Sequence, residues 1–390
     1  MTVPVRVLCV NGGSSSLKLA LYEDENRIAS CDVEGIGFAE GRLGTRDATG
    51  QVVREERGRF SDARAALRAA LEGSAALRPD AIGHRVVHGG PAHDAPEPLT
   101  PRLLAELRTL VPLAPLHLPA ALAGIDAVST LFPGLPQVAC FDTAFHRGLP
   151  AVAHRLPLPR ALAARGIQRY GFHGLSYEYV VATIGAATLG RAVIAHLGNG
   201  ASLAAVRDGR PVDTTMGFTP AGGLMMGTRS GDLDPGILVH LLAHEGFDAS
   251  AIERLVHHES GLLGVSGTTS DMKTLLEVRA TDPRAAEAVE LFCHVLRKHI
   301  GALTAVLGGI DTLVFTGGIG EHAAQVREES CRGLEHLGIR IDRERNDRNE
   351  AVVSAPRSAC TVRTLRTDED LVIARHTRMV VATQLAKEAR

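Results

Sequence analysis

The stretch that decides the fold is VLCVNGGSSSLKLAL, residues 7–21, because its pattern returns later in the chain. The second copy is VIAHLGNGASLAAV, residues 193–206, and a shift of 186 residues aligns Gly12 with Gly198. Each copy is an apolar run, a turn of Gly, Asn and Ser residues, and a second apolar run. Such a turn presents backbone N–H groups and small hydroxyls with no Cβ in the way, which suits close approach to phosphate oxygens.

Either copy alone also fits an ordinary β-hairpin. Occurring together, with Lys18 and Asn199 near the tips, the two copies indicate related half-domains that face each other across a nucleotide cleft. The alternation of strand and helix patterns after the first copy predicts a mixed-sheet α/β protein. We expect an N-terminal domain over residues 1–146 that is completed by residues 371–390. Residues 147–370 are expected to form a C-terminal nucleotide-binding domain.

Composition excludes several classes of function. The 390 residues carry a formal net charge of −2, which argues against a nucleic-acid or membrane-surface partner. No stretch is apolar for long enough to span a bilayer, and the N-terminus lacks the basic and apolar regions of a signal peptide. The six cysteines show no C-x-x-C spacing, so we expect buried free thiols in a reducing, cytoplasmic location.

Capping residues and periodicity place the helices. One helix is expected over residues 61–77 with a Ser N-cap, and another follows Thr100 and Pro101. Further helices are expected over residues 120–131, 176–189, 234–245, 249–257 and 284–307, with strands over 137–141 and 313–316.

Arg85 lies inside an otherwise apolar strand pattern. A buried Arg needs an anionic partner, since an uncompensated buried charge costs several kcal/mol or more. The planar guanidinium suits a carboxylate or a phosphate. The anion can be a substrate or an internal Asp or Glu, and the sequence leaves both open.

The densest candidate segment is residues 213–235, which are rich in Gly and Met and follow no regular period. A long aperiodic loop of this kind usually has a function, although a surface loop is the alternative. Arg229, flanked by Thr and by Ser-Gly, fits a cation placed over a transferring phosphate.

Three further features could carry chemistry. Asp142 ends a strand, and an Asp there in an α/β protein often faces a metal or a nucleophile. His173 lies in YGFHG; a lone His is more often structural, so its functional interpretation depends on convergence with Arg229. The run Gly317-Gly318-Ile319-Gly320 follows a strand and precedes a helix, which suits an anion or nucleotide at a helix N-terminus or simply a structural turn.

Taken in order, these blocks resemble the acetate kinase family, within the superfamily of sugar kinases, actin and heat-shock chaperones. The resemblance runs from Asn11 to Ala374. It rests on the two repeats, on residues 213–235 and on HRVVHGG (84–90), FDTAFH (141–146), YGFHG (170–174), SGLLG (260–264) and FTGGIGE (315–321).

The resemblance implies a two-domain actin-like ATPase (ribonuclease H-like) fold with a duplicated βββαβαβα core. It implies reversible transfer of the ATP γ-phosphoryl to acetate, giving acetyl phosphate and ADP, with Mg²⁺ or alternatively Mn²⁺. A homodimer is also expected from the resemblance.

The same resemblance assigns residues. Catalytic roles fall to Arg85, Asp142, His173 and Arg229. Metal binding falls to Asn11 and Glu369. The substrate pocket would comprise Arg85, Val87, Leu116, Phe172 and Pro220. The nucleotide would be bound by Lys18, His196, Leu197, Gly198, Asn199, Gly200, Asp271, Met272, Lys273, Gly317, Gly318, Ile319, Gly320 and Glu321.

The residue types agree with that chemistry. A small carboxylic acid is already ionised at neutral pH, so the nucleophile needs no strong base. It needs cancellation of the repulsion between two anions, which Arg, His and a metal supply. We therefore expect Asp142 to orient the metal or an Arg rather than to accept a proton. A kinase for propionate or butyrate and a non-catalytic ATP-binding protein of the same fold are the alternatives.

The sequence departs from the family pattern at four places. Leu-His-Asn-Pro is Leu116-His117-Leu118-Pro119 here, and Gly-Thr-Ser-His is Gly174-Leu175-Ser176-Tyr177. Both changes lie near the expected pocket and bear on acyl specificity. Asp-x-Arg is Asp271-Met272-Lys273, and Gly-Glu-Asn is Gly320-Glu321-His322. These two bear on the choice of phosphoryl donor.

Overall fold

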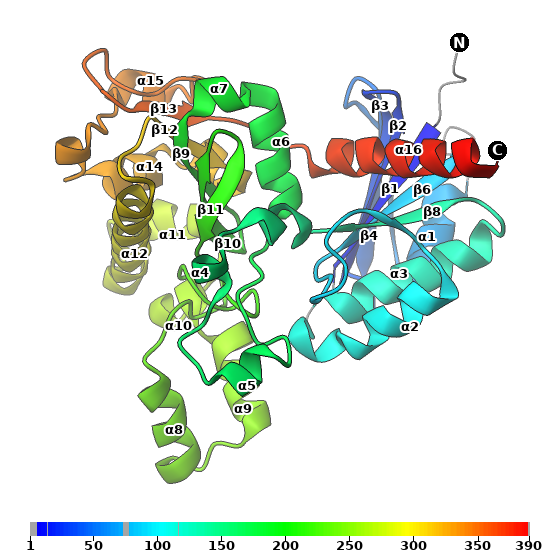
Figure 1. Ribbon diagram of the computed structural model, residues 1–390, viewed down its shortest axis with the longest axis horizontal. Helices are drawn as coiled ribbons and strands as arrows, with labels where there is room; N and C mark the ends of the chain where they lie inside the picture. Colours follow the sequence, from blue (N-terminus) through cyan, green and yellow to red (C-terminus); the bar gives the residue numbers. More distant parts are fainter. Residues whose placement is uncertain (1–5, 14, 73–77, 116, 389–390) are drawn as a thin grey trace. The chain divides into compact units, whose positions relative to one another are not determined.

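The computed structural model describes residues 6–13, 15–72, 78–115 and 117–388 (Figure 1). The described chain divides into two compact units. The N-terminal unit runs to Phe145 and resumes at Asp368, and the C-terminal unit comprises His146–Thr367.

The sheet of the N-terminal unit has the strand order β5-β4-β3-β2-β1-β6-β8-β7 among the described residues. Strands β1 to β5 form an antiparallel meander, and β6 joins β1 and β8 in parallel. The strands are β1 (Arg6–Gly12), β2 (Ser16–Glu23), β3 (Asn26–Glu34), β4 (Gly41–Asp47), β5 (Val52–Gly58), β6 (Ala81–Val86), β7 (Glu97–Pro98) and β8 (Gln137–Phe141).

Helices cover both faces of this sheet. Leu8 and Val10 of β1 pack in a core with α1 and α3, whereas Cys9 between them contacts α16 through its thiol. Because side chains alternate between faces along a strand, α16 lies on the face opposite to α1 and α3. The helices are α1 (Ala63–Leu71), α2 (Pro101–Thr109), the 3₁₀ turn η1 (Val111–Leu113), α3 (Leu118–Leu131) and α16 (Glu369–Glu388). A further 3₁₀ turn, η2 (Ala144–Gly148), lies at the boundary of the units along the chain.

The sheet of the C-terminal unit repeats this arrangement. Its order is β11-β10-β9-β12-β13, with β9 to β11 antiparallel and β9, β12 and β13 parallel. The strands are β9 (Arg191–Leu197), β10 (Ala201–Arg207), β11 (Arg210–Thr214), β12 (Thr312–Thr316) and β13 (Thr361–Thr364). The order matches β3-β2-β1-β6-β8 strand for strand, so the predicted duplicated core is confirmed.

The helices of the C-terminal unit pack around that sheet, with α6 and α12 on either side of the strands in Figure 1. They are α4 (Ala151–His154), α5 (Arg160–Ala163), α6 (Gly174–Ile184), α7 (Ala186–Leu189), α8 (Pro235–His244), α9 (Ala249–Arg254), the π-turn η3 (Leu255–Glu259), α10 (Gly261–Ser266), α11 (Met272–Val278), α12 (Pro283–Leu307), α13 (Gly317–His322), α14 (Ala324–Cys331), the 3₁₀ turn η4 (Glu335–Leu337) and α15 (Arg343–Asp347).

Two helix predictions need correction, and one is confirmed. Asp62, not Ser61, caps α1, because the Asp62 carboxylate accepts a hydrogen bond from the Ala65 N–H. Residues 73–77, the end of the predicted helix, lie outside the described residues. The helix expected over residues 176–189 is divided by Gly185, whose φ of 86° lies outside the helical range. Thr100 caps α2 as predicted.

The single shift of 186 residues does not hold through both turns. The β1–β2 hairpin closes with Gly12 opposite Leu17, whereas the β9–β10 hairpin closes with Leu197 opposite Ala201. The second turn is therefore one residue shorter, and the aligned residues after it take different places in the ladder.

None of the helices within the described ranges combines the length and apolar character that crossing a bilayer requires.

Candidate functional site

Three predicted site residues lie where parallel strands end. Asn11 is on β1, Arg85 is on β6 and Asp142 directly follows β8. Each shares a sheet face with the residue two places before it. Those earlier residues all contact α16, and they are Cys9, Gly83 and Cys140. The three side chains therefore project on the face that α16 covers, beside its first residue, Glu369.

Arg85 is the centre of this group. Its Nε and Nη2 donate to Oδ2 of Asp142 at 3.0 and 2.5 Å, and its Nη1 donates to Oδ1 of Asn11 at 3.3 Å. Oε2 of Glu369 lies 3.8 Å from Nε. Burial acts to lower the pKa of Arg85, but Asp142 and then Glu369 outweigh it and raise that pKa. Of the two anions that the sequence leaves open, the structure provides the internal one, Asp142.

The first turn of α16 is fixed by a contact that sequence reasoning missed. The Tyr22 hydroxyl donates to the Asp368 carboxylate at 2.7 Å, and Oδ1 of Asp368 also accepts from the Leu371 N–H. Asp368 thus caps the helix and sets the position of Glu369. Burial, followed by the charges of Asp368 and Glu369, raises the pKa of Asp370 to about 7. An Asp before a helix is a recognisable cap signal, but no local signal identifies Tyr22.

The two predicted metal ligands fit Mg²⁺. The Asn11 amide oxygen and the Glu369 carboxylate both lie beside the same guanidinium, and oxygen donors of this kind are what Mg²⁺ prefers. Within the described ranges, no group of three or more His, Cys, Asp or Glu side chains could hold a metal. Mg²⁺ commonly takes only one or two protein ligands, together with water and substrate phosphates. Lys18 lies opposite Asn11 across the β1–β2 pair.

The C-terminal unit holds a second group of predicted residues around His173. This residue precedes α6 with φ of 59°, a left-handed backbone that is uncommon for a non-glycine residue and is often found at functional sites. Its Nδ1 lies 2.8 Å from Oγ of Ser202. Its ring stacks on His196 with the centroids 4.2 Å apart. His196 in turn places its Nδ1 2.9 Å from Oγ of Ser176.

The loop that carries Arg229 is anchored in the fold. Arg229 is only 9% exposed, and its Nη1 donates to the Pro220 carbonyl at 3.2 Å. Backbone N–H groups of the SGLLG segment bind the loop from the other side: Ser260 donates to Thr228, Leu262 to Met226 and Leu263 to Gly227. The SGLLG segment therefore holds the loop in place through backbone hydrogen bonds. The loop of residues 213–235 is not a simple surface loop, which was the alternative interpretation.

His173 and Arg229 converge on the turn between β9 and β10. A Cβ built on Gly200 would stand 3.4 Å from Nε2 of His173 and 3.4 Å from Nη1 of Arg229. Two nitrogens that can donate hydrogen bonds thus face one point above a residue without a side chain. An anion bound at that point would be held from two sides.

Seven of the fourteen nucleotide candidates line one cavity of the C-terminal unit, of about 750 Å³. This size is within the usual range for small-molecule sites. The predicted residues that line it are Gly198, Asn199, Asp271, Met272, Lys273, Gly318 and Ile319. The further lining residues are Leu276, Glu277, His322, Ala323 and Gln325. Asp271 also has a structural part, because its carboxylate caps α11 at the Thr274 N–H.

The glycine run 317–320 differs from the prediction in one respect. The helix begins at Gly317 itself, and the Gly317 N–H donates to the Glu321 carboxylate at 3.1 Å, so this N–H already has an internal anion. Gly317 has φ of 76°. Arg327, which sequence reasoning missed, is fully buried and donates to the carbonyls of Gly320 and Glu321 at the end of α13. No sequence pattern marks Arg327, because its other partners, Asn346 and Asn349, lie 19 and 22 residues away.

The remaining candidates are divided between the units. Val87 is buried in the N-terminal unit, and Phe172 and Pro220 are buried in the C-terminal unit. Leu116 lies outside the described residues. Leu197 is a core residue of β9. The predicted substrate pocket is therefore not assembled within either unit alone.

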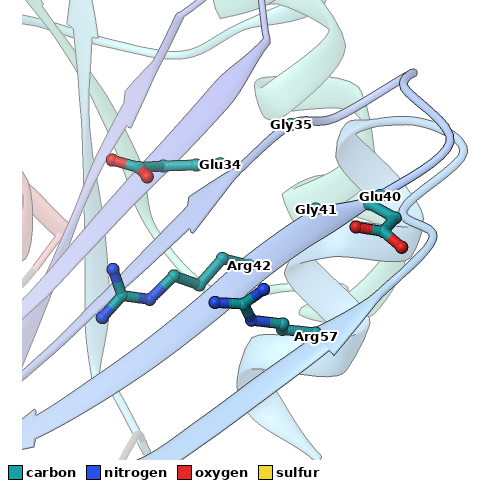
Figure 2. Close-up of a pocket in the computed structure, with 6 residues that line it drawn as sticks. All are labelled: Glu34, Gly35, Glu40, Gly41, Arg42 and Arg57. Atoms are coloured by element: carbon teal, nitrogen blue, oxygen red, sulfur yellow. The ribbon is translucent and has the colours of Figure 1, made fainter.

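A second, shallower hollow of about 290 Å³ lies in the N-terminal unit where β3 turns into β4 (Figure 2). Arg42 and Arg57 are opposite each other on β4 and β5, and Glu34 is opposite Arg42 on β3. All three are exposed, and Arg42 also pairs with Glu55. Because charges of both signs meet there in solvent, and no predicted residue lines it, we place the candidate site elsewhere.

The duplicated sheet and the two groups of side chains define a phosphotransferase of the actin-like ATPase class. The sequence profile of the Acetokinase family matches residues 6–375. The chain therefore belongs to the acetokinase family and is a kinase.

Known proteins of this kind are similar over nearly their whole length. Acetate kinase of Rhodopseudomonas palustris is 45% identical over 95% of this chain and 97% of its own. The crystal structure of Porphyromonas gingivalis acetate kinase superposes with a TM-score of 0.86 at 37% identity, covering 97% of this chain and all of that one. A propionate kinase from Francisella tularensis gives a TM-score of 0.89 at 33% identity, covering 96% and 100%.

Proposed function

We propose that the chain catalyses the reversible, Mg²⁺-dependent transfer of the ATP γ-phosphoryl group to acetate, which gives acetyl phosphate and ADP. The observation that carries this proposal is the convergence of His173 and Arg229 on one point above Gly200. Membership of the acetokinase family and relatives named acetate kinase support acetate as the acceptor.

In this proposal the chain supplies positioning and charge. Arg85, held by Asp142, would bind the acetate carboxylate, which is already ionised and needs no base. His173 and Arg229 would donate to the oxygens of the transferring phosphoryl group, where charge changes during the reaction. The cavity lined by Met272, Leu276 and Ile319 would take the nucleotide.

Asn11 and Glu369 would hold Mg²⁺. Bound there, the ion would neutralise phosphate charge as it does in other phosphoryl transfers. Asp368 and Tyr22 would keep Glu369 in position. Mn²⁺ accepts the same oxygen ligands and would substitute for Mg²⁺.

A hydroxamate assay with Mg-ATP and acetate, propionate or butyrate tests the activity. We expect acetyl hydroxamate to form, and kcat/KM for acetate to exceed that for propionate by roughly tenfold or more, since one methylene is worth about 10- to 200-fold in a shaped pocket. EDTA should abolish the product, and Mg²⁺ or Mn²⁺ should restore it. Absence of acetyl hydroxamate from folded protein, or a higher kcat/KM for a longer acid, would overturn the proposal.

We also propose a homodimer in a reducing, cytoplasmic location. Helix α8 supports the dimer, because Ile237, Val239 and Leu242 are 45, 64 and 48% exposed on it. All six cysteines lie in the described part of the chain, where they are buried and form no disulfide, which supports the reducing compartment. Sedimentation should give twice the monomer mass, and Val239→Asp should shift it towards the monomer. A monomeric wild-type chain would refute the dimer.

A further inference from the structure

A buried chain of hydrogen bonds leads to His173 from its own helix. The Tyr177 hydroxyl, on the first turn of α6, lies 2.5 Å from Oγ of Ser202, and that oxygen lies 2.8 Å from Nδ1 of His173. Tyr177 and Ser202 have no exposed surface, so bulk water does not compete for these groups. A hydrogen-bond chain of this kind in a low-dielectric interior polarises cooperatively.

The backbone explains why these side chains meet. Ser202 on β10 is directly opposite His196 on β9, so both project on one face of the sheet. The first turn of α6 covers that face, with Ser176 bound to His196 and Tyr177 bound to Ser202. Tyr177 occupies the position where the pattern Gly-Thr-Ser-His has its His. This chain therefore reaches Ser202 with a phenol instead of an imidazole.

The acidities of the three groups set the direction of the hydrogen bonds. A phenol is a stronger donor than an aliphatic hydroxyl, and a neutral imidazole nitrogen is the best acceptor of the three. The favoured order is Tyr177 O–H donating to Ser202 Oγ, and Ser202 O–H donating to Nδ1 of His173. Nδ1 then carries no proton, and the neutral ring holds its proton on Nε2.

The Nε2 atom is the one that faces the turn. It lies 3.4 Å from the point where a Cβ of Gly200 would stand, the same point that Nη1 of Arg229 approaches. The stacked ring of His196 likewise has its Nδ1 taken by Ser176 and its Nε2 3.9 Å from the corresponding point on Gly198. Both rings are thus held by Nδ1 and present Nε2 to the glycine turn.

We propose that Tyr177 and Ser202 are positioning residues that hold His173 as the Nε2–H tautomer, so that its donor faces the transferring phosphoryl group. The inference about the tautomer stands on the contacts alone, and its consequence for the rate rests on the proposed function. Partners that orient metal-ligating histidines are typically worth 10- to 100-fold in activity or metal affinity, and we expect an effect of the same order at His173.

The first test measures the tautomer without turnover. In protein labelled with ¹⁵N-histidine at alkaline pH, the His173 resonances are assigned by their loss in His173→Asn. We expect the wild-type shifts of a protonated Nε2 and an unprotonated Nδ1. Tyr177→Phe, which removes only the hydroxyl, should move both shifts towards the average of the two tautomers. An Nδ1–H tautomer in the wild type, or unchanged shifts in Tyr177→Phe, would overturn the proposal even if the enzyme is active.

The second test is kinetic. Tyr177→Phe and Ser202→Ala should each lower kcat by roughly 10- to 100-fold with little change in KM for ATP or acetate. Because Tyr177 acts through Ser202, the double variant should be no slower than Ser202→Ala alone. Additive losses would contradict the chain of contacts.

Tyr170→Phe is the matched control. Tyr170 is also buried, but its hydroxyl donates to the Gly166 carbonyl and lies outside the hydrogen-bond chain of Tyr177, Ser202 and His173. This control should leave the His173 resonances and kcat unchanged. If Tyr177→Phe fails to fold, Ser202→Ala tests the tautomer in its place, since removing Oγ also releases Nδ1. Inactivity of the wild type with a normal Nε2–H tautomer would refute the proposed function and leave the tautomer intact.

Discussion

The pair of Arg85 and Asp142 governs the charge balance at the strand ends of the N-terminal unit. The Asp142 side chain is 1% exposed and the Arg85 side chain 18%. Removing one partner of a buried pair leaves the other charge uncompensated, which costs about 3–5 kcal/mol. Because the same contact orients the guanidinium beside Asn11 and Glu369, we expect this one carboxylate to affect both stability and the proposed function.

Asp142→Asn should lower both kcat and stability. We expect a fall in kcat of roughly 100-fold or more, because the amide no longer holds the guanidinium with a charge-assisted pair. The urea midpoint should fall as well. The shape of the pH profile of kcat should persist, because we expect Asp142 to orient Arg85 rather than to accept a proton. A rate reduced only slightly, or a lost limb of the profile, would contradict this role.

Asp126→Asn provides the control for Asp142→Asn in the same unit. Asp126 pairs with Arg108, and both side chains are more than half exposed. A surface pair of this kind is worth about 0–1 kcal/mol, so activity and the urea midpoint should hardly change.

At the scale of elements, two glycines differ in what their backbone requires: Gly200, in the turn between β9 and β10, and Gly317, the first residue of α13. Gly200 does not need a left-handed backbone, and a Cβ on it would make only ordinary contacts. Gly317 has φ of 76°, and a Cβ on it would stand 2.7 Å from the Leu197 carbonyl oxygen. The backbone therefore requires a glycine at position 317 but not at position 200, although the sequence presents both in similar motifs.

Gly200→Ala should fold normally and be catalytically impaired. The new methyl group would occupy the point that His173 and Arg229 both face, so we expect kcat to fall by roughly 100-fold, as displacements of about 1 Å at a reacting centre can do. The thermal midpoint should stay close to that of the wild type. Gly317→Ala should instead lower the midpoint. Normal turnover by Gly200→Ala would exclude a phosphoryl position above the turn.

Over the whole molecule, the sequence predicts the sheets better than it predicts the contacts that fix the site. The repeated glycine turn predicts both hairpins, because turn chemistry and apolar alternation are local. Arg85, Asp142 and His173 are recognisable as a charged or polar residue at a strand end or in a glycine motif. The residues that hold these side chains in place are not recognisable from the sequence. Tyr22 is hydrogen-bonded to Asp368, 346 residues away, and Tyr177 is hydrogen-bonded to Ser202, 25 residues away. Such partners are determined by tertiary packing.

The free energy of unfolding in acid should depend on a buried histidine in each unit, His84 in the N-terminal unit and His146 in the C-terminal unit. Burial lowers the pKa of His84 to about 4, opposed by its hydrogen bond with Gln137, and burial likewise lowers the pKa of His146 to about 4. In the unfolded chain both titrate near 6.5. Between these values the unfolded state binds more protons, so the free energy of unfolding falls as pH falls from about 6.5 to 4.

Each of these histidines should contribute up to about 3 kcal/mol to that loss. Urea unfolding of the wild type, His84→Gln and His146→Gln across this pH range measures it. Each variant should be less steeply destabilised by acid than the wild type, whatever its stability at neutral pH, because glutamine cannot titrate. Circular dichroism follows the two units together, and hydrogen exchange of each unit assigns the change to the unit that carries the substitution. A variant whose stability falls with acid as steeply as that of the wild type would show that its histidine is already protonated, or not buried, in the folded protein.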